Sequence, residues 1–516
     1  MMQLVTFTCS PEQALDESYL LLEIKNQLNF SSKNKLFFRW KKRSLDARNR
    51  TIKVNCSFEV SEEVLPNLLP DFDFKSVGNE KPIHIIGAGP AGLFAALECL
   101  LLGLKPVLFE RGKEVRARRR DLAQLNKEGL VNPESNYCFG EGGAGTYSDG
   151  KLYTRSKKRG DVDRILQLLV YFGAHENILV EAHPHIGTNK LPQIIEKIRQ
   201  FIIEKGGEVH FESKLTDLKV DSKTITSFEI NASQWIETDS LILATGHSAR
   251  DIFYLLQKHK IRIEAKPFAI GVRVEHQQSF IDQLQYHNQL SGELLPPASY
   301  SLVSQIDGRG VYSFCMCPGG IIAPCATSDG EVVTNGWSPS KRNNPYANSG
   351  IVVSIDPSDF PNFKTNPLVC LEFQKMIEGK AWAAAGKNQK VPAQTLKDFI
   401  DRKKSTHFPE SSYYIGLTSV EMDDIFPAFV VDRLRKGFKE FDKKMPGFIS
   451  QQAIVHAPES RTSSPVLIPR NHETMEHVDI IGLYPCAEGA GYAGGIVSAA
   501  IDGAKCVQAI HNKISK

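Results

Sequence analysis

The segment IHIIGAGPAGLFAALECLLLGLKPVLFE, residues 83–110, decides the fold of this chain. It opens with the apolar run 83–86, turns through a G-x-G-x-x-G pattern, continues with mostly apolar residues over 91–102 and closes with the apolar run 107–109. This order predicts a strand, a glycine turn, a helix packed under a sheet and a second strand. The sequence therefore predicts an α/β fold built on a Rossmann-like domain.

Three glycines and one acidic residue indicate that this turn binds a dinucleotide. Gly87 permits the tight turn, Gly89 leaves room for a pyrophosphate beside the backbone, and Gly92 lets the helix pack closely. The helix N-terminus offers free N–H groups to the phosphates. Glu110, about twenty residues beyond the turn, is placed to accept hydrogen bonds from a ribose 2′-OH. The alternative, an ordinary α/β turn, does not account for the strand, the helix and the acid at these distances together.

Length and composition limit the class of protein. The chain has 516 residues, 41% of them hydrophobic and 23% charged, which is typical of a soluble globular protein with several domains. The net charge of +3 indicates no particular partner. The first residues lack the features of a signal peptide, and no apolar run reaches the roughly 18 residues of a membrane span. The ten cysteines show no disulfide or zinc spacing, so we expect a reduced cytoplasmic protein without a metal centre.

The first 75 residues are predicted to form a small α+β domain, followed by a linker at 65–80. Strands are expected at 3–8, 35–40 and 51–60, with a helix from Ser10 to about Leu28. Nine basic residues gather between Lys33 and Lys53, interleaved with aromatic residues. They are consistent with a nucleic-acid surface. They are equally consistent with a strand that buries its aromatics and exposes a solvated basic face.

A glycine-rich segment at 139–151 suggests backbone that passes close to a flat, bulky ligand. Six of its residues are glycine or alanine, and Thr146, Ser148 and Lys151 could add polar contacts. Before it, Arg111 is the one arginine that we expect at the cofactor. The arginines that follow are predicted to lie on a solvated helix face: Arg116, Arg118, Arg119 and Arg120.

Later segments are predicted to complete the same domain. A helix is expected at 190–205 and strands at 208–211, 215–220, 224–230 and 240–244, the last of which ends in A-T-G. A further strand at 478–484 leads into a second glycine turn and a helix at 496–510. We do not interpret this turn as a second dinucleotide site, because the strand and acid that such a unit needs do not follow. It is expected to complete the first site, with Glu488 binding polyol hydroxyls.

The middle of the chain, residues 261–444, contains no standard catalytic motif. Its C-x-C pair, Cys315 and Cys317, differs from the C-x-x-C of dithiol oxidoreductases. Two thiols near a redox cofactor could take part in redox chemistry, and buried inert cysteines are the alternative.

Several motifs carry a resemblance to known flavoproteins. The front G-A-G-P-A-G with Glu110, the A-T-G at 244–246 and the terminal C-A-E-G-A-G-Y-A-G-G resemble the FAD domain of the glutathione-reductase type. More narrowly, the chain resembles a family of bacterial FAD-dependent dehydrogenases. The motifs that carry this are FGEGGAGTYSDGKL at 139–152, ATGHSARD at 244–251, KPFAIGVRVEH at 266–276, CMCPGG at 315–320 and RTSSPV at 461–466.

The resemblance implies FAD as cofactor and a set of contacts to it. Glu488 stands where relatives have Asp at the ribitol, Leu215 lies near the adenine through its backbone, and Gly495 with Ile496 faces the isoalloxazine. Catalytic roles do not transfer, and Cys317, His247 and Arg461 are candidates only for the pocket. The residues expected at FAD are Gly87, Gly89, Pro90, Ala91, Gly92, Glu110, Arg111, Gly142, Gly143, Gly145, Thr146, Ser148, Leu215, Thr245, Gly246, Glu488, Gly489, Gly495 and Ile496.

Together these observations predict an FAD-dependent oxidoreductase that passes two electrons between flavin and a small organic substrate. The FAD-binding domain is expected at 81–260 and 445–516, with an α+β substrate or cap domain at 261–444 between them. No second Rossmann unit is visible, so NAD(P)H is expected to bind only transiently. The alternatives are an FAD-dependent RNA-modifying or RNA-binding protein that uses the basic N-terminal domain, and a flavin-bearing module without turnover.

Overall fold

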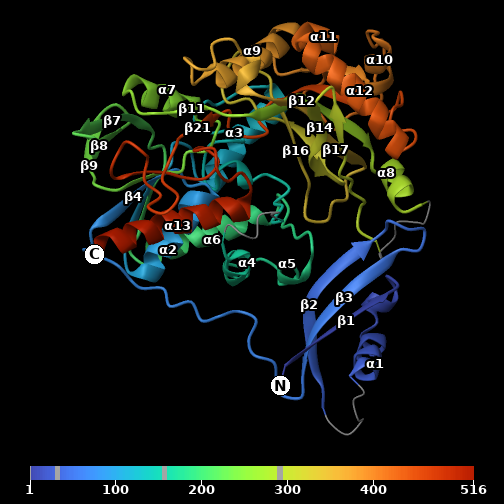
Figure 1. Ribbon diagram of the computed structural model, residues 1–516, viewed down its shortest axis with the longest axis horizontal. Helices are drawn as coiled ribbons and strands as arrows, with labels where there is room; N and C mark the ends of the chain where they lie inside the picture. Colours follow the sequence, from blue (N-terminus) through green and yellow to red (C-terminus); the bar gives the residue numbers. More distant parts are fainter. Residues whose placement is uncertain (1, 29–34, 154–159, 288–294, 516) are drawn as a thin grey trace.

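The computed structural model describes residues 2–28, 35–153, 160–287 and 295–515. Figure 1 shows three parts: a small N-terminal domain set apart from the rest, a layer with a parallel sheet and its helices, and a layer with a larger mixed sheet. The predicted combination of a Rossmann-like domain, an inserted α+β domain and a small N-terminal α+β domain is confirmed. No helix within the described ranges is long and apolar enough to cross a membrane.

The N-terminal domain packs one helix against three antiparallel strands. The strands β1 (Gln3–Cys9), β3 (Lys53–Ser61) and β2 (Phe37–Asp46) lie in that order in the sheet. Helix α1 (Glu17–Gln27) begins later than the predicted Ser10. The carboxylate of Asp16 accepts hydrogen bonds from the N–H groups of Ser18 and Tyr19 and so caps the helix. Only a short 3-10 turn, Gln13–Leu15, follows Ser10.

The basic strand of this domain turns its aromatic side chains inward. Phe38 and Trp40 pack on buried Phe58, with ring centroids 5.8 and 4.2 Å away. Arg39 and Lys41 both pair with Glu59, at 2.7 and 2.9 Å. At least three of the nine basic residues therefore pair with acids of the domain, since Arg48 also pairs with Asp46 at 2.6 Å. Arg43 forms an ion pair with Glu181 of the main body, whereas Lys33 lies outside the described residues.

Among the described residues, five parallel strands form the sheet that carries the glycine turn. Their order is β22 (Leu483–Pro485), β10 (Leu241–Leu243), β4 (Pro82–Ile86), β5 (Lys105–Phe109) and β6 (Glu208–His210). Because all five run parallel, their carboxyl ends meet at one edge. The glycine turn, Glu110, the A-T-G segment and the second glycine turn all follow directly on these ends. This is the edge at which open α/β sheets bind ligands.

Helices cover one face of this sheet and a strand meander covers the other. Helices α2 (Pro90–Leu102) and α13 (Ile496–Ile514) lie side by side on the first face, next to α6 (Leu191–Glu204) (Figure 1). The antiparallel strands β7 (Leu215–Asp221), β8 (Thr224–Ile230) and β9 (Gln234–Glu237) pack on the second face. The other helices of this layer are α3 (Val115–Glu128), α4 (Val162–Tyr171), α5 (Asn177–Val180) and α7 (Arg250–Lys258).

The described strands of the inserted domain form a mixed seven-stranded sheet. Its order is β13 (Val303–Ile306), β14 (Arg309–Cys317), β17 (Tyr346–Ile355), β12 (Phe268–Gln277), β20 (Ile454–Glu459), β18 (Val391–Thr395) and β19 (Leu417–Ser419). Its helices are α8 (Gln278–Gln285), α9 (Val369–Ala384), α10 (Leu396–Asp401), α11 (Met422–Ile425) and α12 (Ala428–Lys444). A two-stranded sheet of β15 (Ile321–Pro324) and β16 (Thr334–Trp337) adjoins it.

The chain returns to the parallel layer later than the predicted residue 445. Strand β20 pairs with β12 and β18 in the middle of the large sheet, so residues 454–459 belong to the inserted domain. The crossing itself is marked by β11 (Glu264–Ala265) and β21 (Val466–Leu467), which pair with each other. Sequence alone did not reveal this, because a single buried strand carries no sign of the sheet that it joins.

The predicted strand at 478–484 is also shorter in the structure. Only β22 is strand, because Gly482 adopts a left-handed φ of +81° and turns the chain just before it.

Gly503 sets the distance between α13 and α2, which gives a test of this packing. A Cβ at Gly503 would lie 2.0 Å from the carbonyl oxygen of Ala91, whereas a Cβ at helical Gly379 would meet nothing closer than 3.8 Å. We expect Gly503→Ala to lower the free energy of unfolding by about 1–3 kcal/mol, because the helices must move apart. Gly379→Ala should raise it by about 0.5–1 kcal/mol through helix propensity.

Thermal unfolding of both variants, followed by circular dichroism, checks this pair. Equal melting temperatures for the two variants would contradict the close approach of α13 and α2.

Candidate functional site

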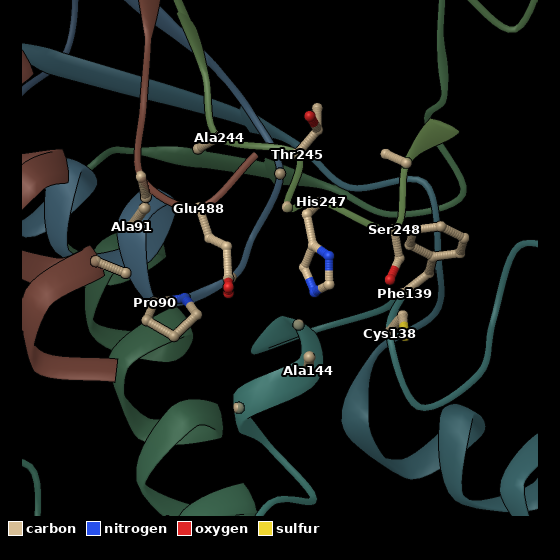
Figure 2. A pocket seen from close by; sticks show the side chains of 18 of the residues that line it. Pro90, Ala91, Cys138, Phe139, Ala144, Ala244, Thr245, His247, Ser248 and Glu488 are labelled. Carbon is tan, nitrogen blue, oxygen red and sulfur yellow. The ribbon is translucent and has the colours of Figure 1, made fainter. Parts of the chain in front are cut away.

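A pocket opens at the carboxyl edge of the parallel sheet, between this sheet and the inserted domain. Its walls come from the glycine turn, the glycine-rich segment, the loops after β10 and β22, and the inner side of the large sheet. Figure 2 shows residues from four of these segments around one open space. The predicted residues that line it are Gly87, Gly89, Pro90, Ala91, Glu110, Arg111, Gly143, Gly145, Ser148, Leu215, Thr245, Gly246, His247, Arg461, Glu488, Gly495 and Ile496.

The glycine turn leaves one backbone position open toward the pocket. Gly87 has a φ of +105°, and a Cβ at Gly92 would lie 1.9 Å from the Gly87 carbonyl oxygen, so both positions require glycine. Gly89 is different, because its φ is −74° and a Cβ there would meet only the Gly143 Cα, at 3.9 Å. Gly89 is also the N-cap of α2 and no side chain caps it. The first N–H groups of α2 are therefore available to an anion.

The carboxylate of Glu110 organises the backbone around this turn. It accepts hydrogen bonds of 2.9 Å from the N–H groups of Ala88, Gly112 and Gly140, and its residue is 5% exposed. A carboxylate has about four acceptor positions, so three bonds to backbone leave room for one more. The ribose contact expected of Glu110 remains a prediction, and its position at the pocket wall is compatible with it.

Arg118 holds the glycine-rich segment in place through hydrogen bonds to its backbone carbonyl groups. Its guanidinium is fully buried and donates to the carbonyl oxygens of Asn136, Tyr137, Glu141 and Gly143 at 2.8 to 3.0 Å. The solvated helix face predicted for these arginines is correct for Arg116, Arg119 and Arg120, which are exposed, but wrong for Arg118. The sequence did not distinguish them, because the four carbonyls that need donors belong to a loop folded over the helix.

Five predicted residues do not line the pocket. Gly92 and Gly489 are needed for close backbone contacts, since a Cβ at Gly489 would lie 2.9 Å from Gly246 backbone atoms. Gly142 adopts a φ of +77° within the glycine-rich loop. Thr146 is buried, and its hydroxyl donates to the Glu141 carbonyl at 2.6 Å. Cys317 is completely buried behind the wall. The three glycines and Thr146 therefore shape the site without lining it.

Arg111 lines the pocket but is held by its own neighbours. It lies over the Phe139 ring at 4.1 Å and pairs with Glu134 at 2.6 Å and with Asp251 at 2.9 Å. Two carboxylates already neutralise its charge. A ligand beside Arg111 would therefore contact an arginine that is fixed in position and already paired with two carboxylates.

Two uncharged titratable groups project into the pocket near Pro90 and Ala144 (Figure 2). Burial raises the pKa of Glu488 to about 8, although the nearby Lys266 opposes the shift. Burial and the positive charges of Arg461 and Arg250 lower the pKa of His247 to about 3. At neutral pH the first group therefore carries its proton and the second does not. The Nδ1 atom of His247 is buried without a hydrogen-bond partner in the structure.

Arg461 belongs to a buried cluster that joins the two layers. It pairs with Glu331 at 2.6 Å and Glu378 at 3.2 Å, and Arg250 of helix α7 pairs with the same two carboxylates at 3.0 and 2.6 Å. The hydroxyl of Thr327 accepts from Arg461 at 2.9 Å. Arg461 lies at the pocket wall, but its guanidinium is already paired with the two carboxylates of this cluster.

The inserted domain contributes wall residues that were not among the expected site residues. The strand end at Phe314 and Cys315 and the residue Asn335 face the pocket, opposite Asp149 and Lys151 of the glycine-rich segment. Cys315 therefore occupies the place in the pocket wall that was predicted for Cys317. The signal was present in the C-x-C spacing, but a bulge in β14 decides which thiol faces inward.

Two family models and one curated protein match this chain. Residues 267–462 match the family described as FAD-dependent protein, C-terminal domain-like, and residues 1–61 match a domain of unknown function. An uncharacterized protein of Clostridium beijerinckii is 40% identical over 524 residues, which cover 97% of each chain.

Solved structures also show similarity at low identity. A geranylgeranyl bacteriochlorophyll reductase-like protein of Thermoplasma acidophilum is 13% identical with a TM-score of 0.34, over 85% of this chain and 79% of that one. An L-amino acid deaminase of Proteus vulgaris is 10% identical with a TM-score of 0.34, over 86% and 96%. Glycine oxidase of Bacillus cereus is 12% identical with a TM-score of 0.31, over 84% and 96%.

The buried guanidinium of Arg118 provides a stability test. Arg118→Met would leave the Asn136 and Tyr137 carbonyls without a donor from the described residues and would remove one of the donors to Glu141 and Gly143. We therefore expect the free energy of unfolding to fall by about 3 kcal/mol or more. Arg120→Met changes an exposed position of the same helix and should alter it by no more than about 0.5 kcal/mol. Urea unfolding followed by fluorescence measures both. Equal losses in the two variants would show that Arg118 does not hold the loop.

The raised pKa of Glu488 predicts a pH dependence of stability. The folded ligand-free protein keeps the proton up to about pH 8, while the unfolded chain releases it near 4.5. Stability that is present below pH 4.5 is therefore lost as the pH rises through 8. Glu488→Gln removes this loss, so its melting temperature relative to the unaltered protein should rise between pH 6 and pH 9. A pH-independent difference would contradict the shift.

Proposed function

This chain belongs to the same protein family as the uncharacterized Clostridium beijerinckii protein, and we propose that it is an FAD-dependent oxidoreductase. The observation that carries the proposal is the open position at Gly89, on the uncapped N-terminus of α2 and inside the pocket. The match of residues 267–462 to a family of FAD-dependent proteins supports it. The expected activity is transfer of two electrons to or from a small organic substrate.

The residues that line the pocket are suited to bind an FAD molecule along its length. The turn at Gly89 and the N–H groups of α2 suit the pyrophosphate, and Glu110 at the next strand end suits the adenosine ribose. At the other end, the N-terminus of α13 begins at Gly495, which also lines the pocket. Two helix N-termini and a carboxylate thus point to one extended anionic ligand with a polar sugar at one end.

Glu488 is suited to the ribitol chain because it is desolvated in the ligand-free protein. A buried carboxyl group that carries a proton at neutral pH is both a donor and an acceptor of hydrogen bonds. Polyol hydroxyls are donors and acceptors as well, so they can satisfy it without a charged partner. When bound, FAD would supply the redox chemistry of the pocket.

The protein's own contribution is to orient the reactants and exclude water. The inserted domain closes the pocket with Phe314, Cys315 and Asn335, so the reacting end is enclosed between the two layers. His247 stays neutral and can accept a hydrogen bond from a substrate at Nδ1, which has no partner among the described residues. The alternative of an RNA-binding or RNA-modifying protein has less support than the oxidoreductase. Phe38 and Trp40 pack on Phe58 instead of facing outward.

FAD binding to Gly89 variants tests this proposal. Gly89→Ala leaves the fold unstrained, because its Cβ meets only the Gly143 Cα at 3.9 Å, but it fills the space expected for the pyrophosphate. We expect at least a tenfold weaker affinity for FAD, or about 1.4 kcal/mol. Gly78→Ala, with nothing within 4 Å of its Cβ, is the control and should bind FAD normally.

The measurement is flavin absorbance of the purified proteins, then titration of the apoproteins with FAD, then anaerobic addition of NADH or NADPH. Bleaching would identify a nicotinamide as reductant. A protein that takes up no FAD under any of these conditions would overturn the proposal, as would equal affinities of Gly89→Ala and Gly78→Ala.

A further inference from the structure

Two cysteines of the inserted domain lie close to the pocket, one in its wall and the other behind that wall. Cys315 is partly exposed and lines the pocket, whereas Cys317 is completely buried. The register between β14 and β17 shifts between Phe314 and Cys317, and Cys315 adopts a φ of +47°. At this bulge the Cys317 thiol donates a hydrogen bond to the Cys315 carbonyl oxygen, and its Sγ lies 3.3 Å from that oxygen.

Charged groups of three segments surround this pair and make its two members unequal. The Lys151 ammonium donates to the carbonyl of Met316, between the cysteines, and the buried Arg273 guanidinium donates to the Cys315 carbonyl at 3.3 Å. The neighbouring Cys317 thiol and these two cations lower the pKa of Cys315, while burial and the Asp149 carboxylate oppose the shift. Burial and the neighbouring Cys315 raise the pKa of Cys317.

The pocket wall near Cys315 also carries a buried polar atom without a partner in the structure. Asp149 lines the pocket and is 2% exposed, and its Oδ1 atom has no hydrogen-bond partner in the structure. Its other oxygen pairs with Arg342 at 2.9 Å. A buried, unpaired carboxylate oxygen is costly unless a ligand or water meets it. The end of the pocket at Cys315 is thus built to receive a polar molecule.

We propose that Cys315 and Cys317 are a dithiol–disulfide couple and that the substrate of this pocket is a small disulfide. Cys315 is the attacking thiol because it faces the pocket, and Cys317 is the resolving thiol behind it. The inference rests on the proposed flavin function only for the source of its electrons. In this proposal electrons pass from the flavin to the two cysteines of the inserted domain and from there to the substrate.

The reaction balances in two exchange steps. The Cys315 thiolate attacks one sulfur of the substrate disulfide, forms a mixed disulfide and releases the first thiolate, which takes up a proton. The Cys317 thiol then loses its proton and attacks the Cys315 sulfur, which releases the second substrate thiol and leaves a Cys315–Cys317 disulfide. FAD, when bound and reduced, would supply the two electrons and two protons that return this disulfide to the dithiol.

Trapping experiments on the full-length protein test the couple without depending on FAD. The reduced apoprotein is treated with bis(2-hydroxyethyl) disulfide, quenched with acid, alkylated and digested for mass spectrometry. We expect one linked peptide, in which an internal disulfide joins Cys315 to Cys317 and neither of the two cysteines is alkylated. In Cys317→Ser the mixed disulfide should accumulate at Cys315, and in Cys315→Ser neither product should form. Cys370→Ala, which removes a buried thiol of α9, is the control and should form the linked peptide.

A second measurement separates this inference from the proposed function. In protein loaded with FAD and reduced with dithionite, the disulfide probe should restore flavin absorbance at least tenfold more slowly in Cys315→Ala and Cys317→Ala than in Cys370→Ala. Failure to bind FAD would remove the proposed function but leave the trapping result. Alkylation of Cys315 without any linked peptide, or oxidation of Cys138 in its place, would overturn the couple. Equal flavin reoxidation in all three variants would overturn it as well.

Discussion

The carboxylate of Glu110 is the interaction on which the arrangement of the site depends. By accepting N–H groups from Ala88, Gly112 and Gly140, it fixes the glycine turn, its own strand end and the glycine-rich segment relative to one another. Each of these backbone groups would otherwise be buried without a partner, which costs about 1–3 kcal/mol per group. Arg118 completes the same frame from the other side by donating to the carbonyls of the glycine-rich segment.

A second constraint holds the two layers together across the pocket. Arg250 and Arg461 share the carboxylates of Glu331 and Glu378, so four buried charges are satisfied only when the parallel layer and the inserted domain are in contact. Removing one partner of such a cluster leaves an uncompensated buried charge, which typically costs about 3–5 kcal/mol. The cluster therefore stabilises one relative position of the layers, and with it the width of the pocket between them.

The two ends of the pocket differ in chemistry because different layers form them. Toward the glycine turn, the walls offer backbone N–H groups and helix N-termini, which suit phosphates and sugars. Toward the inserted domain, the walls carry thiols, the Lys151 ammonium and the unpaired oxygen of Asp149. Glu488 and His247 lie between these ends, and both are uncharged at neutral pH because burial opposes their charged forms. The proposed cofactor and the proposed substrate would thus be held by separate sets of groups.

The sequence by itself determined the parallel layer and most of the walls at its edge. Glycine positions, strand periodicity and the spacing to Glu110 are local properties, and the structure places Gly89, Glu110, Gly246 and Glu488 around one pocket. Tertiary structure alone decided the rest. The burial of Arg118, the place of β20 in the large sheet and the choice of Cys315 over Cys317 all depend on segments far apart in the chain. Such contacts form only when the layers pack, so no local pattern encodes them.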